Sequence, residues 1–100
     1  MSITRINTFE AKPEQADELR EFLSSIIDVI VGAAGCRSVE LLVSRDDPRR
    51  LAIVEVWDSA EAHQAAASRI PPDMMKHAMS LFASRPEGTY YDSIVRKAAV

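Results

Sequence analysis

Residues 51–66 read LAIVEVWDSAEAHQAA, and this stretch decides the fold. Apolar residues dominate up to Trp57, which predicts a buried strand. Asp58 follows as the predicted N-cap of a helix, and Glu61 stands at the position that completes a capping-box pair. The chain therefore passes directly from a strand into a helix. Trp57 lies on one side of that corner and His63 lies one turn inside the helix.

The remaining elements follow from apolar periodicity on either side of this corner. Pro13 and Glu14 are typical of a helix opening, because proline loses no hydrogen bond there and a carboxylate meets the positive helix end. The segment 45–50 has turn chemistry and is too short for a crossover, so its flanking strands form a hairpin. The predicted strands are 3–11, 36–44, 51–57 and 89–96; the predicted helices are 13–30, 59–69 and 73–84, the last two separated by Ile70-Pro71-Pro72.

This order, β-α-β-β-α-β, predicts an α+β fold in a single domain of residues 1–100. It is the ferredoxin-like arrangement, an antiparallel sheet with helices on one face. The strands carry too many Val, Leu, Ile, Trp and Tyr residues for the other face to be polar. We therefore predict a homodimer in which two sheets pack face to face.

Composition restricts the partners and the compartment. The net charge is −3 and no basic run is present, so no nucleic-acid partner is predicted. The single cysteine, Cys36, excludes an internal disulfide and suits the cytoplasm. No apolar stretch is long enough to span a bilayer, so no membrane association is predicted. No zinc spacing, phosphate loop or nucleophilic triad is present, and no metal site is predicted.

Three segments resemble the antibiotic biosynthesis monooxygenase family. They are ITRINTFEAKPEQADELREFL (3–23), GCRSVELLVSRDDPRRLAIVEVWDSAEAHQAA (35–66) and GTYYDSIV (88–95). The most specific part is the strand that ends in Trp57 and continues as Asp-Ser-x-Glu-Ala. The resemblance implies a dimeric α+β barrel. It implies cofactor-independent oxygenation of phenols, quinols or related molecules in some members and oxidative breakdown of heme in others, while further members have no demonstrated activity.

The heme-degrading branch of the family implies three residues. They are an asparagine in the first strand, a tryptophan in the second helix and a histidine in the segment that follows. Asn7 matches the asparagine, and His77 lies roughly where the histidine belongs. Ala66 stands where the tryptophan belongs, and Trp57 is a different residue. The missing tryptophan argues against heme degradation.

Asn7, His63 and His77 are the candidate catalytic residues. Asparagine is depleted in strands, so Asn7 needs a reason. It either orients a ligand oxygen or bonds a metal-bound water, or it faces solvent or bonds a neighbouring backbone group. His63 shares a helical face with small alanines, which predicts a thin wall beside Trp57 and a cavity there. It is either an acid–base group in that wall or a core histidine with a satisfied ring. His77 is an iron ligand, a base or a surface residue.

Six residues are predicted to bind substrate. Trp57 is expected mainly to fill the corner between strand and helix and only secondarily to line a pocket. Arg5 shares a face with Asn7 and pairs either with an anionic substrate or with Glu10 or Glu55. Tyr90 and its neighbour point to opposite faces of the last strand, so one of them enters the pocket or the dimer interface. The full set is Arg5, Trp57, Ala66, Met74, Phe82 and Tyr90.

With these residues, the family resemblance implies a cofactor-independent monooxygenase acting on a small aromatic quinol, phenol or anthrone with dioxygen. A base, His63 or His77, removes a proton, and Asn7 stabilises the resulting oxyanion or peroxide. One alternative is a heme-binding or heme-degrading monooxygenase with His77 as the iron ligand. The other is a non-catalytic dimer that binds a small metabolite, which a cavity filled by side chains would favour.

Overall fold

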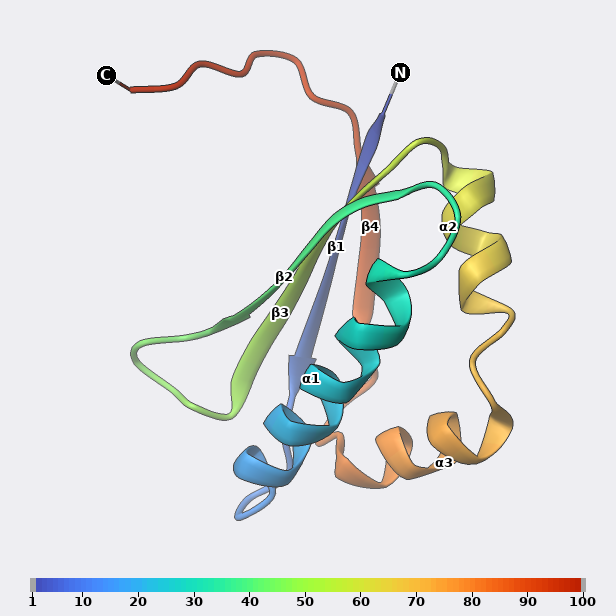
Figure 1. Ribbon diagram of the computed structural model, residues 1–100. Coiled ribbons are helices and arrows are strands. Elements are labelled where there is room, and N and C mark those ends of the chain that lie inside the picture. The colour runs from blue at the N-terminus through green and yellow to red at the C-terminus, as the bar shows by residue number, and fades with distance from the viewer. Residues whose placement is uncertain (1, 100) are drawn as a thin grey trace.

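Residues 2–99 form a four-stranded antiparallel sheet with three helices on one side of it (Figure 1). The computed structural model describes residues 2–99. The elements are β1 (Ile3–Glu10), α1 (Ala16–Val31), β2 (Cys36–Val43), β3 (Arg50–Trp57), α2 (Ala60–Ala67), α3 (Pro72–Leu81) and β4 (Glu87–Tyr91). The strand order is β2-β3-β1-β4, and each neighbouring pair is antiparallel. The predicted ferredoxin-like α+β fold is confirmed.

Strand β3 shows why the sheet has one covered face. Its residues alternate between buried and partly exposed along the whole strand, as expected when successive side chains point to opposite faces. The buried positions are Leu51, Ile53, Glu55 and Trp57. Three of these are apolar and one is a carboxylate, and this exception defines the site described below. The main core cluster consists of Phe9, Ala11, Leu19, Leu23, Leu51, Ile53 and Leu81.

The first helix begins later than the sequence predicts. Helix α1 starts at Ala16, and Pro13 and Glu14 lie in the preceding turn. Glu14 has a φ of 68°, which is in the left-handed region and is incompatible with the first turn of an α-helix. The prediction that Pro13 opens the helix was therefore wrong.

The N-cap of α2 is Ser59, whereas the sequence pattern predicts Asp58. The Ser59 Oγ atom accepts a hydrogen bond from the Ala62 amide at 3.1 Å. Asp58 instead pairs with the Arg37 Nε atom of β2 at 2.6 Å. The ion pair ties the end of β3 to the start of β2, and the serine one residue later caps the helix.

The last helix and the last strand also end earlier than predicted. Phe82 adopts an extended backbone and pairs with Ala11, so α3 ends at Leu81 and does not reach residue 84. Strand β4 pairs with β1 from Glu87 to Tyr91, and its last partner is Thr4, near the start of β1. No strand partner continues past this point within residues 2–99, so residues 92–96 do not extend the strand as predicted.

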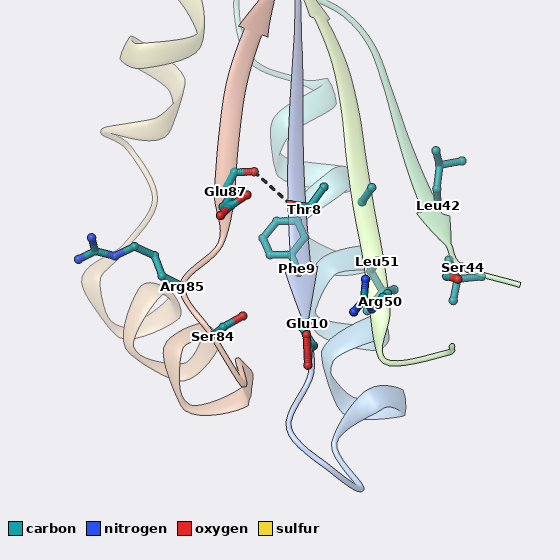
Figure 2. A pocket seen from close by; sticks show the side chains of 12 residues that line it. Thr8, Phe9, Glu10, Leu42, Ser44, Arg50, Leu51, Ser84, Arg85 and Glu87 are labelled. Carbon is teal, nitrogen blue, oxygen red and sulfur yellow. Dashed lines mark hydrogen bonds between the residues drawn. The ribbon is translucent and has the colours of Figure 1, made fainter. Parts of the chain in front are cut away.

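The face of the sheet opposite the helices is uncovered. Leu42 and Tyr91 keep 43% and 51% of their surface exposed there, and an open depression of about 620 Å³ lies at the end of the sheet near Thr8 (Figure 2). Thr8 Oγ1 donates to the Glu87 carbonyl at 3.5 Å across this depression. The sheet-to-sheet homodimer stays a prediction. Among residues 2–99, no helix has the length and apolarity needed to cross a membrane.

Candidate functional site

A cavity of about 530 Å³ lies between the covered face of the sheet and the helices. Its volume is in the range of small-molecule sites. Most of its wall is apolar and comes from α1, from α2 with the segment after it, from α3 and from the inner face of the sheet. The apolar lining residues include Phe9, Phe22, Leu23, Ile26, Ile30, Ile53, Ala66, Ala67, Ile70, Met75, Ala78 and Phe82.

The cavity exists because the α2 wall is thin. Ala66 and Ala67 face it, and α2 contributes no fully buried residue to the core. Trp57 is only 1% exposed and fills the corner where β3 meets α2, as predicted. The indole fills that corner, and the alanine wall beyond it leaves space, so the predicted cavity beside Trp57 is present.

One end of the cavity is polar because sheet register brings three strands to the same level. Arg5 of β1 is opposite Glu55 of β3 on one side and opposite Tyr90 of β4 on the other. Asn7 lies two residues further along the same face of β1. His63 reaches the same end from α2. These five residues are called the polar cluster below.

Glu55 is the buried carboxyl group of the polar cluster. It is 4% exposed, and Trp57 Nε1 donates a hydrogen bond to its Oε1 at 2.7 Å. Burial raises the pKa of Glu55, while the Trp57 hydrogen bond and the charge of Arg5 act in the opposite direction. From the sequence, Glu55 was expected only as a possible partner of Arg5. Its place in the alternation of β3, between Ile53 and Trp57, was the signal that it would be buried.

His63 has both ring nitrogens directed at polar-cluster atoms. Its Nδ1 is 2.6 Å from the Tyr90 hydroxyl, and its Nε2 is 4.0 Å from Glu55 Oε1. The rings of Trp57 and Tyr90 each meet the imidazole edge-on, with centroids 5.5 Å away. Burial, assisted by the charge of Arg5, lowers the pKa of His63, so the ring is neutral at neutral pH.

Arg5 depends on a glycine in the neighbouring strand. Its guanidinium lies over the Tyr90 ring, 5.2 Å from the centroid. It also lies across Gly88, where an added Cβ atom would be 2.6 Å from the Arg5 Cζ atom. Only a residue without a Cβ leaves this space, and a sequence pattern gives no indication of the contact. Glu10, the other partner considered for Arg5, pairs with Arg49 at 3.4 Å.

Asn7 lines the cavity and its side-chain oxygen is unsatisfied. Among residues 2–99, the buried Oδ1 atom finds no hydrogen-bond partner. Buried polar atoms are nearly always paired, so each exception calls for a reason. The backbone-bonding alternative for the Asn7 oxygen is therefore not realised, and the amide remains available to the cavity.

The structure separates the two histidines. His77 lies on α3 with about half of its side chain exposed, and its Nε2 is 3.8 Å from Glu18 Oε1. Its ring contacts Phe22 from outside the cavity, at a centroid distance of 5.2 Å. Of the six residues predicted to bind substrate, four line the cavity: Arg5, Trp57, Ala66 and Phe82. Met74 does not line it, whereas its neighbour Met75 does. Tyr90 joins the site through its contact with His63.

The sequence profile described as "Antibiotic biosynthesis monooxygenase" matches residues 2–80. The chain belongs to this family. The match includes Trp57, His63 and the whole covered face of the sheet except β4. The resemblance given by the strand-end signature is therefore confirmed, and the site described above is the cavity of an antibiotic biosynthesis monooxygenase domain.

Solved structures share the fold of this antibiotic biosynthesis monooxygenase domain over nearly its whole length. Rv0793 from Mycobacterium tuberculosis has a TM-score of 0.84 at 21% identity, covering 98% of this chain and 100% of that one. SnoaB from Streptomyces nogalater, a cofactor-independent oxygenase, has a TM-score of 0.78 at 18% identity and covers 95% of both chains. Protein SO0527 from Shewanella oneidensis has a TM-score of 0.78 at 28% identity, over 90% and 88% of the two chains. No curated protein matches the sequence significantly.

The residues do not fit a heme held through His77. That histidine is outside the cavity and faces Glu18, and Ala66 occupies the position of the helix tryptophan. The histidine that does line the cavity, His63, lies on α2 and is not the one that the heme-degrading branch implies. The donor set expected of the heme-degrading branch is thus not assembled around this cavity.

Proposed function

We propose that this protein is a monooxygenase that uses dioxygen to oxidise a small aromatic molecule bearing an acidic hydroxyl group, without a tightly bound cofactor. The observation that carries the proposal is the cavity itself: about 530 Å³, apolar along its walls and polar at one end. Membership of the family and the likeness to SnoaB, a cofactor-independent oxygenase, support it. The chain would act in the cytoplasm, in keeping with its single free Cys36.

The proposed chemistry starts with proton removal at the polar cluster. The substrate hydroxyl lies against Glu55 and His63, and loss of its proton leaves an electron-rich anion that passes an electron to dioxygen. The substrate supplies the two electrons that reduce the second oxygen atom to water. Correctly placed proton transfer contributes about 10²–10⁴ in rate. The apolar walls keep water away from the reactive intermediates.

Asn7 is the proposed stabiliser of negative charge on oxygen. Its side chain lines the cavity on the same strand face as Arg5, and its Nδ2–H groups are the donors that would meet an oxyanion. Its Oδ1 atom, which has no partner in the described part of the chain, can accept a hydrogen bond from a ligand hydroxyl. A placed amide donor next to a developing oxyanion is worth roughly 10²–10³ in rate. His77 has no part in the proposed reaction, because it lies outside the cavity.

The proposed active unit is a homodimer that buries the uncovered sheet face. That face presents Ile6, Val54 and Val56, which are half-buried in one copy, together with the exposed Leu42 and Tyr91. An apolar sheet face of this kind is commonly covered by a second copy in small domains. Sedimentation velocity would test it: Val54→Lys should produce monomers, and a wild-type protein that sediments as a monomer contradicts it.

The oxygenase activity is tested by oxygen uptake with anthrone and with a naphthohydroquinone. The wild-type rate should exceed the uncatalysed rate, and Asn7→Ala should lower it by roughly 10²-fold. Met74→Leu, outside the cavity, is the matched control and should leave the rate unchanged. A wild-type rate equal to the uncatalysed rate for both substrates contradicts the proposal.

An open cavity also bears on the non-catalytic alternative. A dimer without turnover was expected to have the space filled by side chains. The volume beside Ala66 and Ala67 is not filled, which favours a site that takes up a small molecule. Both the enzyme and a non-catalytic dimer that binds a small metabolite use such a cavity, and the oxygen-uptake measurement distinguishes them.

A further inference from the structure

The buried carboxyl group of Glu55 is not explained by packing. It stands among apolar residues on the covered face of β3, and burial of a charged carboxylate is unfavourable unless it is paired. Arg5 is its cross-strand neighbour, yet no Arg5–Glu55 ion pair is formed within residues 2–99, because the guanidinium lies over Tyr90 and Gly88. Trp57 Nε1 donates the hydrogen bond that holds one of its oxygens.

The gap between Glu55 and His63 has the dimensions of a binding position. Glu55 Oε1 and His63 Nε2 are 4.0 Å apart, which is too long for a direct hydrogen bond. A single oxygen atom can lie about 2.8 Å from both at once, within the normal range of hydrogen bonds. Both atoms belong to residues that line the cavity, so a ligand hydroxyl can reach this position.

The tautomer of His63 follows from its two neighbours. An N–H directed at a carboxylate is favourable, so the hydrogen of the neutral ring belongs on Nε2. Nδ1 then carries the lone pair and accepts the Tyr90 O–H, 2.6 Å away. In this arrangement His63 is a hydrogen-bond donor to the gap and has no free lone pair facing it.

We propose that Glu55, and not His63, takes the proton of the substrate hydroxyl, and that neutral His63 donates its Nε2–H to the oxygen anion that forms. The substrate O–H bond breaks, its proton bonds to the Glu55 carboxylate, and the electron pair stays on the substrate oxygen. This inference rests on the proposed function for the identity of the hydroxyl compound. Glu55 is then a catalytic residue and Tyr90 a positioning residue that fixes the tautomer.

The electrostatics of the polar cluster agree with these roles. Burial raises the pKa of Glu55, which makes it a stronger base than an exposed carboxylate, and lowers the pKa of His63, which keeps the ring neutral. Each of the four strands contributes a polar or titratable group that lies near Glu55 and His63. These groups are Arg5 from β1, Cys36 from β2, Trp57 from β3 and Tyr90 from β4, with Arg69 lining the cavity after α2.

The test counts protons when a phenol binds. The probe is 4-nitro-1-naphthol, whose visible absorbance reports its ionised form, added below the pKa of the free dye. Calorimetry in two buffers of different ionisation enthalpy measures the protons released on binding. The variants are Glu55→Gln and His63→Gln, with Glu18→Gln as the control, since Glu18 is an exposed carboxylate beside the other histidine.

In the wild-type protein and in Glu18→Gln, the bound dye should be ionised with no proton released, because Glu55 retains it. His63→Gln should show the same proton count with weaker binding. Glu55→Gln should bind the dye in its neutral form. If this variant binds the anion instead, binding should release a proton, and the affinity for the dye should rise about tenfold per pH unit. Near-ultraviolet circular dichroism establishes that each variant is folded, and Glu55→Asp, which keeps a carboxylate, should recover part of the ionisation.

Two results would overturn the inference. One is a wild-type protein that does not ionise the dye. The other is that the Glu55→Gln protein binds the ionised dye without releasing a proton, while the His63→Gln protein releases one. His63 would then be the base. Failure of the oxygenase proposal is separate, because it appears as absent oxygen uptake in a protein whose dye ionisation still follows Glu55.

Discussion

The buried carboxyl group of Glu55 makes the stability of the protein depend on pH in a predictable way. Burial raises its pKa above the ordinary value of 4.5. The native state therefore binds more protons than the unfolded state between the unfolded and the native pKa. The contribution of Glu55 to the free energy of unfolding is complete below about pH 4.5 and is lost as the pH rises through the native pKa. A native pKa one pH unit above the unfolded pKa corresponds to about 1.4 kcal/mol.

Glu55→Gln removes this dependence with little change of shape. The glutamine oxygen still accepts the Trp57 N–H, and no charge is buried. We expect the variant to be more stable than the wild type at neutral pH, by about 1.4 kcal/mol for each pH unit that separates the native pKa of Glu55 from its unfolded pKa. For a domain of this size, 1 kcal/mol moves Tm by roughly 4–8 °C. The difference should shrink to near zero at pH 4.

The assay is urea denaturation of both proteins at intervals from pH 4 to pH 8. His63 contributes an opposite slope, because its pKa is lowered and its charged form is favoured only in the unfolded chain below about pH 6.5. Subtracting the variant profile from the wild-type profile removes most of that slope. Glu18→Gln controls for the loss of a surface carboxylate. A difference profile that is flat, or that rises in favour of the wild type with pH, would refute the reasoning.

Further substitutions test other parts of the structure. Gly88→Ala should displace the Arg5 guanidinium and so raise the pKa of His63, which NMR titration of the imidazole measures. Tm should change by only a few degrees, because the flexible end of the Arg5 side chain can move, and an unchanged titration would contradict the role of Arg5. Ala66→Phe should fill the cavity and abolish binding of 4-nitro-1-naphthol without lowering Tm. An unchanged affinity for the dye would show that the dye binds elsewhere. Ser59→Ala should lower the free energy of unfolding by about 1 kcal/mol through loss of the α2 cap, whereas Asp58→Ala should not remove that cap.

Family membership and the order of the elements were predictable because they depend on local signals. The alternation in β3, the short hairpin before it and the Trp57 corner each involve residues that are close in sequence. The alanine face of α2 likewise predicted a cavity from helical spacing alone. His63, Ala66 and Trp57 all line that cavity.

The errors at the ends of α3 and β4 occurred where an element meets a distant one. Phe82 leaves the helix because it pairs with Ala11, and β4 ends at Tyr91, opposite Thr4 near the start of β1. A helical pattern around residue 77 did not reveal which side of α3 faces the cavity, so His77 could not be separated from His63. That distinction depends on how α3 packs against α1, where Phe22 and Glu18 meet the His77 ring.

The sequence by itself determined the order of the elements, the family and the apolar pocket beside Trp57. Only the tertiary structure decided which polar groups share that pocket. Arg5, Glu55 and Tyr90 come from three strands that are far apart in the chain, and sheet register alone brings them to one level. Hydrophobic periodicity specifies which face of a strand is buried, but the alignment of one strand with another is set by backbone hydrogen bonds between segments far apart in the chain.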